Sequence, residues 1–118
     1  MIVINSDTVE AVQAQDEIVG KGPVYMKALI DAKQTGGFGM LLVTFSPGAR
    51  LHFHTHTYEQ ILYVTEGRGI VATRDAEHTV TAGAAIYIPP GEVHWHGATE
   101  DASFSHIAIQ KPGIALAK

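Results

Sequence analysis

Three histidines and a glutamine have the residue types and the spacing of a metal site. His54 and His56 are separated by one residue, and in a β-strand such residues point to the same face. A short turn would return the chain and bring Gln60 beside the two imidazoles. Pro90-Gly91 suits the centre of a type II turn, which would place His94 at the start of a strand facing the others across a barrel. The predicted ligands are therefore His54, His56, Gln60 and His94.

The donor atoms of these four ligands are all neutral, which bears on the metal and its chemistry. Imidazole nitrogen binds most first-row transition metals, and the glutamine amide adds a hard oxygen. Such a ligand set leaves the double charge of a divalent ion uncompensated, so the ion is a strong Lewis acid that attracts an anionic ligand. Four protein ligands saturate tetrahedral zinc but leave manganese or iron with open positions. We expect one divalent ion per chain, manganese or iron in preference to nickel, cobalt or zinc.

The residue before Gln60 is an alternative fourth ligand. If the Glu59 carboxylate bound the ion, the Gln60 amide would lie behind the ligands. Strand alternation places these two side chains on opposite faces, and Gln60 has the parity of the inward-facing residues Leu62 and Val64. The alternation therefore favours Gln60.

A further histidine is a candidate for proton transfer. His106 lies in an apolar run, 104–108, and an inward imidazole beside a metal cavity could act as a general acid or base. The alternative is a buried core histidine with no chemical role. His52 is expected nearer the rim of the barrel, while His96 lies one pleat, about 7 Å, beyond His94 and outside the ligand set. His78 is expected in solvent on a hairpin.

The elements that must position these residues are short strands. Glycine and proline divide the chain into pieces rich in Val, Ile, Tyr, Phe and Thr, as expected for a sandwich or barrel. The predicted strands are 24–30, 38–46, 59–66, 70–74, 78–81, 84–88, 93–98 and 103–110. Gly67-Arg68-Gly69 is interpreted as a break between two of them. The segment 7–17 is given one helical turn or none, and the end of the chain is expected to be a loose tail.

Length and composition exclude several classes of protein. The 118 residues suit one domain, which we divide into an N-terminal segment (1–22) that covers an edge or is swapped, a barrel (23–111) and a tail (112–118). The absence of cysteine excludes disulfides and thiolate sites. A net charge of −4 without a basic cluster argues against nucleic acid, and no apolar run is long enough to span a membrane. The N-terminus lacks a signal-peptide pattern, so we expect a cytoplasmic protein.

Two stretches of the chain resemble the paired motifs of the cupin family. The first contains Gly48, His54, His56, Gln60 and Gly67, separated by five, one, three and six residues. The second contains Gly83, Pro89, Gly91 and His94, separated by five, one and two residues. Gln60 stands where the family usually has Glu, and Ala98 stands where it usually has Asn. The resemblance implies an all-β, antiparallel jelly-roll barrel that holds one metal ion.

The glutamine in the first motif resembles two narrower groups of cupins. One is the manganese hydroxynitrile lyases, to which residues 47–50, 63–67, 94–98 and 106–109 are also similar. The other is the cupins that open unsaturated uronate rings, which resemble residues 54–60. Both resemblances imply a small organic substrate.

Three classes of function follow from these observations. The first is a metal-dependent enzyme, either a lyase or isomerase in which His106 moves a proton, or an Fe(II) dioxygenase acting on a small diketone or aromatic acid. The second is a non-catalytic module that binds a small sugar or acid. The third is a barrel with a purely structural metal. The chain leaves no room for a DNA-binding domain, which favours the enzyme over a regulator.

We also expect a homodimer. A small jelly roll has exposed sheet edges, and an N-terminal strand can cover the edge of a partner. The apolar segment 24–30 is the candidate for this contact.

Overall fold

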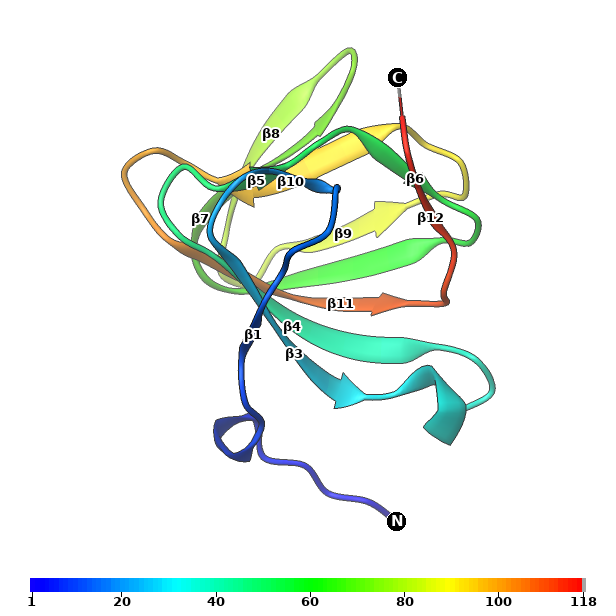
Figure 1. Ribbon diagram of the computed structural model, residues 1–118. Coiled ribbons are helices and arrows are strands. Elements are labelled where there is room, and N and C mark those ends of the chain that lie inside the picture. The colour runs from blue at the N-terminus through cyan, green and yellow to red at the C-terminus, as the bar shows by residue number, and fades with distance from the viewer. Residues whose placement is uncertain (118) are drawn as a thin grey trace.

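Runs of β-branched and aromatic residues bounded by glycine and proline form antiparallel strands throughout the computed structural model, which describes residues 1–117 (Figure 1). In order, these are β1 (Val12–Gln13), β2 (Val19–Lys21), β3 (Val24–Ile30), β4 (Gly39–Phe45), β5 (Arg50–Leu51), β6 (His54–His56), β7 (Gln60–Thr73), β8 (Glu77–Thr81), β9 (Ala85–Ile88), β10 (His94–Ala98), β11 (Phe104–Gln110) and β12 (Ile114–Leu116). Two single 3-10 turns, η1 (Ser6–Thr8) and η2 (Ala32–Gln34), are the helical elements within the described residues.

The strands curl into a barrel because β7 belongs to both of its sheets. The first half of β7 pairs with β9 and β11, and β11 continues through β4 to β3 and β1. The second half pairs with β8 and β10, and β10 continues to β5 and β6. The all-β, antiparallel jelly roll expected from the sequence is confirmed, and the low helical content with it.

The expected break at Gly67-Arg68-Gly69 is wrong, because one strand of 14 residues runs through it. Gly67 has φ of 78°, and a Cβ there would lie 1.9 Å from the carbonyl oxygen of Ser103. A Cβ at Gly69 would lie 2.5 Å from the ring of Phe104. The glycines therefore bend the strand and admit close neighbours without ending it.

The chain end is not the loose tail that the sequence indicated. Ile114–Leu116 forms β12, which pairs with β6 so that Ile114 is opposite His56 and Leu116 is opposite His54. Gly113, at φ of 126°, turns the chain into this strand, and its carbonyl accepts from the Thr57 backbone N–H. At the other end, β1 and β2 of segment 1–22 pair with β3 and β5 of the same chain.

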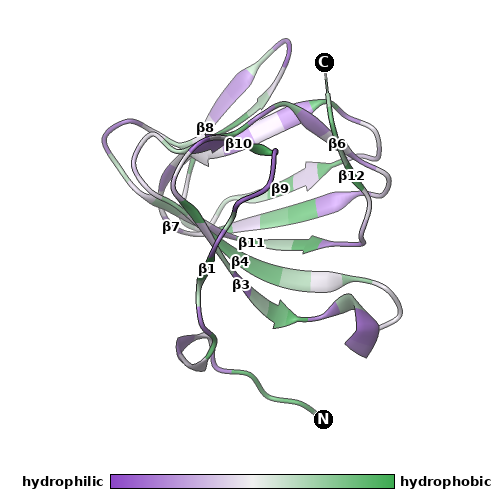
Figure 2. Cartoon of the chain, in the orientation of Figure 1, coloured by the Kyte–Doolittle hydropathy of each residue, from purple (hydrophilic) through white to green (hydrophobic). Residues whose placement is uncertain are grey.

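The interior combines an apolar core with an unusual group of buried polar side chains. One cluster is centred on Phe45 and Phe104, and a smaller one contains Leu62, Val71 and Ile88. Hydrophobic residues are frequent on β3, β4, β9 and β11, whereas β8 is largely hydrophilic (Figure 2). The buried polar side chains are His54, His56, Gln60, His94, His96, Ser105 and His106. Since polar residues are rarely buried without a reason, this group marks the candidate site. Residues 1–117 contain no helix long and apolar enough to cross a membrane.

Candidate metal centre

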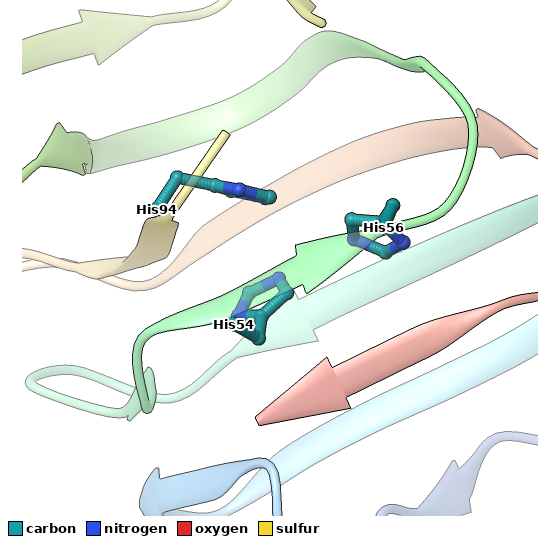
Figure 3. A group of neighbouring side chains, drawn as sticks. All are labelled: His54, His56 and His94. Atoms are coloured by element: carbon teal, nitrogen blue, oxygen red, sulfur yellow. The ribbon is translucent and has the colours of Figure 1, made fainter. Parts of the chain in front are cut away.

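His54, His56 and His94 converge inside the barrel (Figure 3). The first two point inward from β6, and His94 begins β10 directly opposite His54 in the antiparallel register. One ring nitrogen from each residue lies within 4.8 Å of the others. All three side chains are at most 4% exposed. This is the convergence that the His-x-His spacing and the Pro90-Gly91 turn predict.

Hydrogen bonds fix which nitrogen of two of these imidazoles carries the proton. His54 Nδ1 lies 2.8 Å from the carbonyl oxygen of His52, and His94 Nδ1 lies 2.8 Å from that of Glu92. A carbonyl oxygen only accepts, so both Nδ1 atoms donate and both Nε2 atoms present a lone pair. Among the described residues, His54 Nε2 and both nitrogens of His56 have no hydrogen-bond partner.

Gln60 adds another lone pair to the same point. It begins β7, and its Oε1 lies 3.2 Å from His94 Nε2. The Gln60 Nε2 group donates to Gln110 Oε1, so the oxygen is the end that faces His94. Gln60 Oε1 carries no hydrogen, and neither does Nε2 of a neutral His94 whose proton is on Nδ1. A cation held by both atoms relieves this conflict, and the donor set therefore fits a divalent metal ion.

Burial keeps these imidazoles in the form that binds metal. Desolvation, with a smaller contribution from charge repulsion by neighbouring imidazoles, lowers the pKa of His54 and His56 to about 4. Desolvation also lowers the pKa of His94 below its ordinary value. The three rings are neutral at pH 7, so a metal ion would not have to displace protons from them.

His106 and His96 form a hydrogen-bonded pair beside the three metal-facing histidines. His106 is fully buried, and its Nε2 lies 3.0 Å from His96 Nδ1. Desolvation lowers the pKa of His106 to about 4 and that of His96 well below the ordinary value. Both rings are therefore neutral, and one donates to the other. The cavity that both line is also lined by His54, His56, Gln60, Gln110 and the apolar residues Ile18, Met26, Leu41, Val43, Leu51, Ala108 and Ile114.

The geometry agrees with a family assignment made from sequence. Residues 41–109 match the profile of the cupin domain. This chain belongs to the cupin family. It is 37% identical over 100 residues to a curated (R)-mandelonitrile lyase of Granulicella tundricola. The aligned region covers 78% of this chain and 76% of that lyase. It is 35% identical over 75 residues to the dimethylsulfoniopropionate lyase DddW of Ruegeria pomeroyi, over 62% of this chain and 49% of that protein.

A solved structure supports the same assignment. A cupin-like protein of Thermotoga maritima superposes with a TM-score of 0.86 at 31% identity, covering 94% of this chain and 88% of that one. The cupin fold and the family are therefore both shown, and two curated relatives are lyases.

The orientation predicted for the glutamine of this cupin is confirmed. Gln60 is 3% exposed and faces His94, whereas Glu59 is exposed on the outer surface. The role of Gln60 as a ligand stays a prediction. His52 is exposed and only its carbonyl contacts the site, and His78 is exposed on β8, as expected.

Sequence reasoning missed one residue of this cupin site. Gln110, the last residue of β11, pairs with Gln60 in the strand register and hydrogen-bonds to its side chain. Alternation along β11 gives the signal that could have found it, because Gln110 shares the inward parity of His106 and Ala108.

Proposed function

We propose that this cupin is a metal-dependent lyase that cleaves cyanohydrins into a carbonyl compound and hydrogen cyanide. The observation that carries the proposal is one cavity lined by His54, His56, Gln60 and the His96–His106 pair. His94 converges with His54 and His56 beside it. The 37% identity to (R)-mandelonitrile lyase supports this reaction over other lyase chemistry.

In this proposal the metal is held by one nitrogen from each of His54, His56 and His94 and by Gln60 Oε1. When bound, the ion supplies Lewis-acid polarisation of the substrate. Manganese or iron suits this role because each keeps positions open beyond four protein ligands. The neutral histidines and amide leave the positive charge of the ion available to the substrate.

His106 is the proposed proton-transfer group. It takes the hydroxyl proton of the cyanohydrin as the carbonyl double bond forms. The bond to the nitrile carbon breaks with its electron pair leaving on cyanide. The same proton is then delivered to cyanide, and hydrogen cyanide departs. The hydrogen bond between His106 Nε2 and His96 Nδ1 holds the His106 ring in place during both transfers. In the tautomer that this role requires, His106 Nε2 donates to His96 Nδ1, and the lone pair of His106 Nδ1 takes the proton.

The apolar part of the lining supports this chemistry by excluding water. Met26, Leu41 and Leu51 come from three different strands and line the cavity with the histidines. Charge interactions are stronger where water is excluded, so a neutral substrate gains more from the site than it would in solvent. The lining contains no Asp, Glu, Lys or Arg among the described residues. The apolar lining suits the carbon skeleton of a cyanohydrin such as mandelonitrile, and a bound ion would stabilise the negative charge that develops on cleavage.

The test is cleavage of mandelonitrile by protein stripped of metal and then reloaded. Both enantiomers are supplied, and benzaldehyde release is measured with Mn(II), Fe(II) or Zn(II) restored. We expect activity to be absent in the stripped protein and to return with Mn(II) or Fe(II). Absence of cleavage with every metal contradicts the proposal. Metal-dependent oxygen uptake with a diketone would favour the dioxygenase, and ligand binding without turnover would favour the binding module.

A further inference from the structure

Gln110 lies where it can decide which end of the Gln60 amide faces the metal ligands. The two residues are direct cross-strand partners on β11 and β7. Gln60 is 3% exposed, so water has little access to its amide. Its Nε2 donates to Gln110 Oε1, and its Oε1 is left facing His94 Nε2.

The orientation matters because the two ends of an amide are opposite in character. Oε1 carries lone pairs that can bind a metal, whereas the Nε2 group carries two hydrogens and cannot. If the amide turned over, Nε2 would donate to the lone pair of His94 Nε2. That arrangement satisfies both groups without metal and occupies the lone pair that His94 would give to the ion. A metal-free site therefore favours the inverted amide unless another acceptor holds Nε2.

We propose that Gln110 is a positioning residue that holds Gln60 in its metal-binding orientation by accepting a hydrogen bond from Nε2. The inference rests on the proposed metal site and deepens it. Gln110 need not touch the ion, because its effect passes through the amide of Gln60. A residue behind a metal ligand typically changes metal affinity by about 10–100-fold when it is removed.

The test is a titration of the metal-stripped full chain with Mn(II) alone, followed by the electron paramagnetic resonance signal of the free ion. Gln110→Leu removes the acceptor but keeps the bulk, and we expect Mn(II) affinity to fall by about 10–100-fold. Gln110→Glu keeps the acceptor and should retain at least the affinity of the unmodified chain. Equal affinity in Gln110→Leu and the unmodified chain overturns the inference.

A second background separates positioning from packing. Gln60→Glu replaces the amide with a carboxylate whose two oxygens are equivalent, so its orientation no longer matters. In that background Gln110→Leu should change Mn(II) affinity by less than about 3-fold. The difference between the two backgrounds would show, as a double-mutant cycle, that positions 60 and 110 are strongly coupled. An equal loss in both backgrounds means that Gln110 acts by packing and overturns the inference. If Gln110→Leu fails to fold, Gln110→Ala replaces it in both arms.

The proposed function fails in a different way. If the unmodified chain binds no Mn(II), the metal site itself is wrong, and the proposed function falls together with this inference. If the unmodified chain binds Mn(II) and both Gln110 variants bind it equally well, only the positioning role is wrong.

Discussion

Single residues in this cupin are arranged so that lone pairs face one another without hydrogens between them. His54 and His94 each donate through Nδ1 to a backbone carbonyl, which leaves Nε2 as an acceptor. Gln60 Oε1 adds another acceptor 3.2 Å from His94 Nε2. Buried acceptors in contact are costly unless a donor or a cation joins them. We therefore expect a bound metal ion to lower the energy of these buried acceptors and to stabilise the folded protein.

His106→Ala tests the proton-transfer role. General acid–base assistance typically contributes about 10²–10⁴ in rate, so we expect kcat for cyanohydrin cleavage to fall by that factor. Metal content should stay at one ion per chain, because His106 lies outside the group of three converging histidines. His78→Ala, on exposed β8, is the matched control and should match the unmodified chain. Loss of metal would make His106 a ligand, and full activity would make it an ordinary core residue.

The buried histidines also predict how stability depends on pH. The folded-state pKa of His54, His56 and His106 is about 4, below the ordinary 6.5, so the unfolded chain binds more protons between these values. The stability of the metal-free protein is fully present above about pH 6.5 and is lost as the pH falls towards 4. Urea unfolding should show a lower midpoint at pH 5 than at pH 7. An unchanged midpoint would contradict the lowered pKa values.

Residue alternation predicted much of the site and missed the rest for a definite reason. His54, His56, Gln60 and His94 were found because each follows from strand parity or a turn. The bonds His96–His106 and Gln60–Gln110 depend on how β11 is aligned with β7 and β10. A register shift between Ser105 and His106 sets that alignment, and nothing local in the sequence reveals it.

At the scale of elements, the bent strand β7 joins the two sheets and positions both sides of the site. It begins at Gln60, passes Gly67 and Gly69, and ends beside His94 at Thr73. The sequence predicted two strands, because a pair of glycines occurs both where a strand bends and where a strand ends. What keeps β7 a single strand is its pairing, first with β11 and then with β10. Both pairings join residues far apart in the sequence, so the local sequence does not reveal them. β12 was missed similarly, because its strand is held by backbone pairing with β6 and its side chains are exposed.

Gly69→Ala tests the close packing at this bend. The new Cβ would meet the ring of buried Phe104 at 2.5 Å, so the neighbours must shift. We expect the free energy of unfolding to fall by about 1–3 kcal/mol, as for other overpacked cores. Gly36→Ala is the matched control, because a Cβ there meets nothing within 4 Å. Equal urea midpoints for the two variants would contradict this account of the bend.

At the scale of the whole molecule, large apolar side chains are exposed on the outer face of the sheet that contains β9, the first half of β7, β11 and β4. Its exposed large side chains are Phe38, Tyr58, Ile61, Tyr63, Tyr87 and Ile109. Ile61 is opposite Tyr87 on one side and Ile109 on the other, so the patch is continuous across β9, β7 and β11. A fully exposed side chain of this size has about 200 Å² of accessible surface. The six are about half exposed, so the patch presents roughly 600 Å² of apolar surface.

The size of this patch suits a second copy of the chain. A standard interface buries about 800 Å² per partner, and about 65% of a homodimer interface is apolar. Glu59 and Lys111 line the same surface groove, so a two-fold axis could pair them across the interface. The homodimer stays a prediction, and this face is a second candidate for its interface beside the expected one at β3 (Val24–Ile30). The edge of β3 is already paired in part with β1.

Sedimentation velocity at micromolar concentration tests the dimer. We expect a dimer for the unmodified chain and a monomer for Tyr63→Lys combined with Tyr87→Lys, because a buried unpaired charge is costly. Thr79→Lys, on exposed β8, is the control and should remain dimeric. A monomeric unmodified chain, or a dimer that survives both lysines, would contradict the predicted interface.

We predict that one divalent ion is held by His54, His56, His94 and Gln60. The most direct measurement is elemental analysis of protein purified without added metal, for the unmodified chain and for His54→Ala, His56→Ala and His78→Ala. We expect one manganese or iron ion per chain in the unmodified protein and in His78→Ala, and none in the other two variants. Full metal occupancy in both His54→Ala and His56→Ala would contradict it.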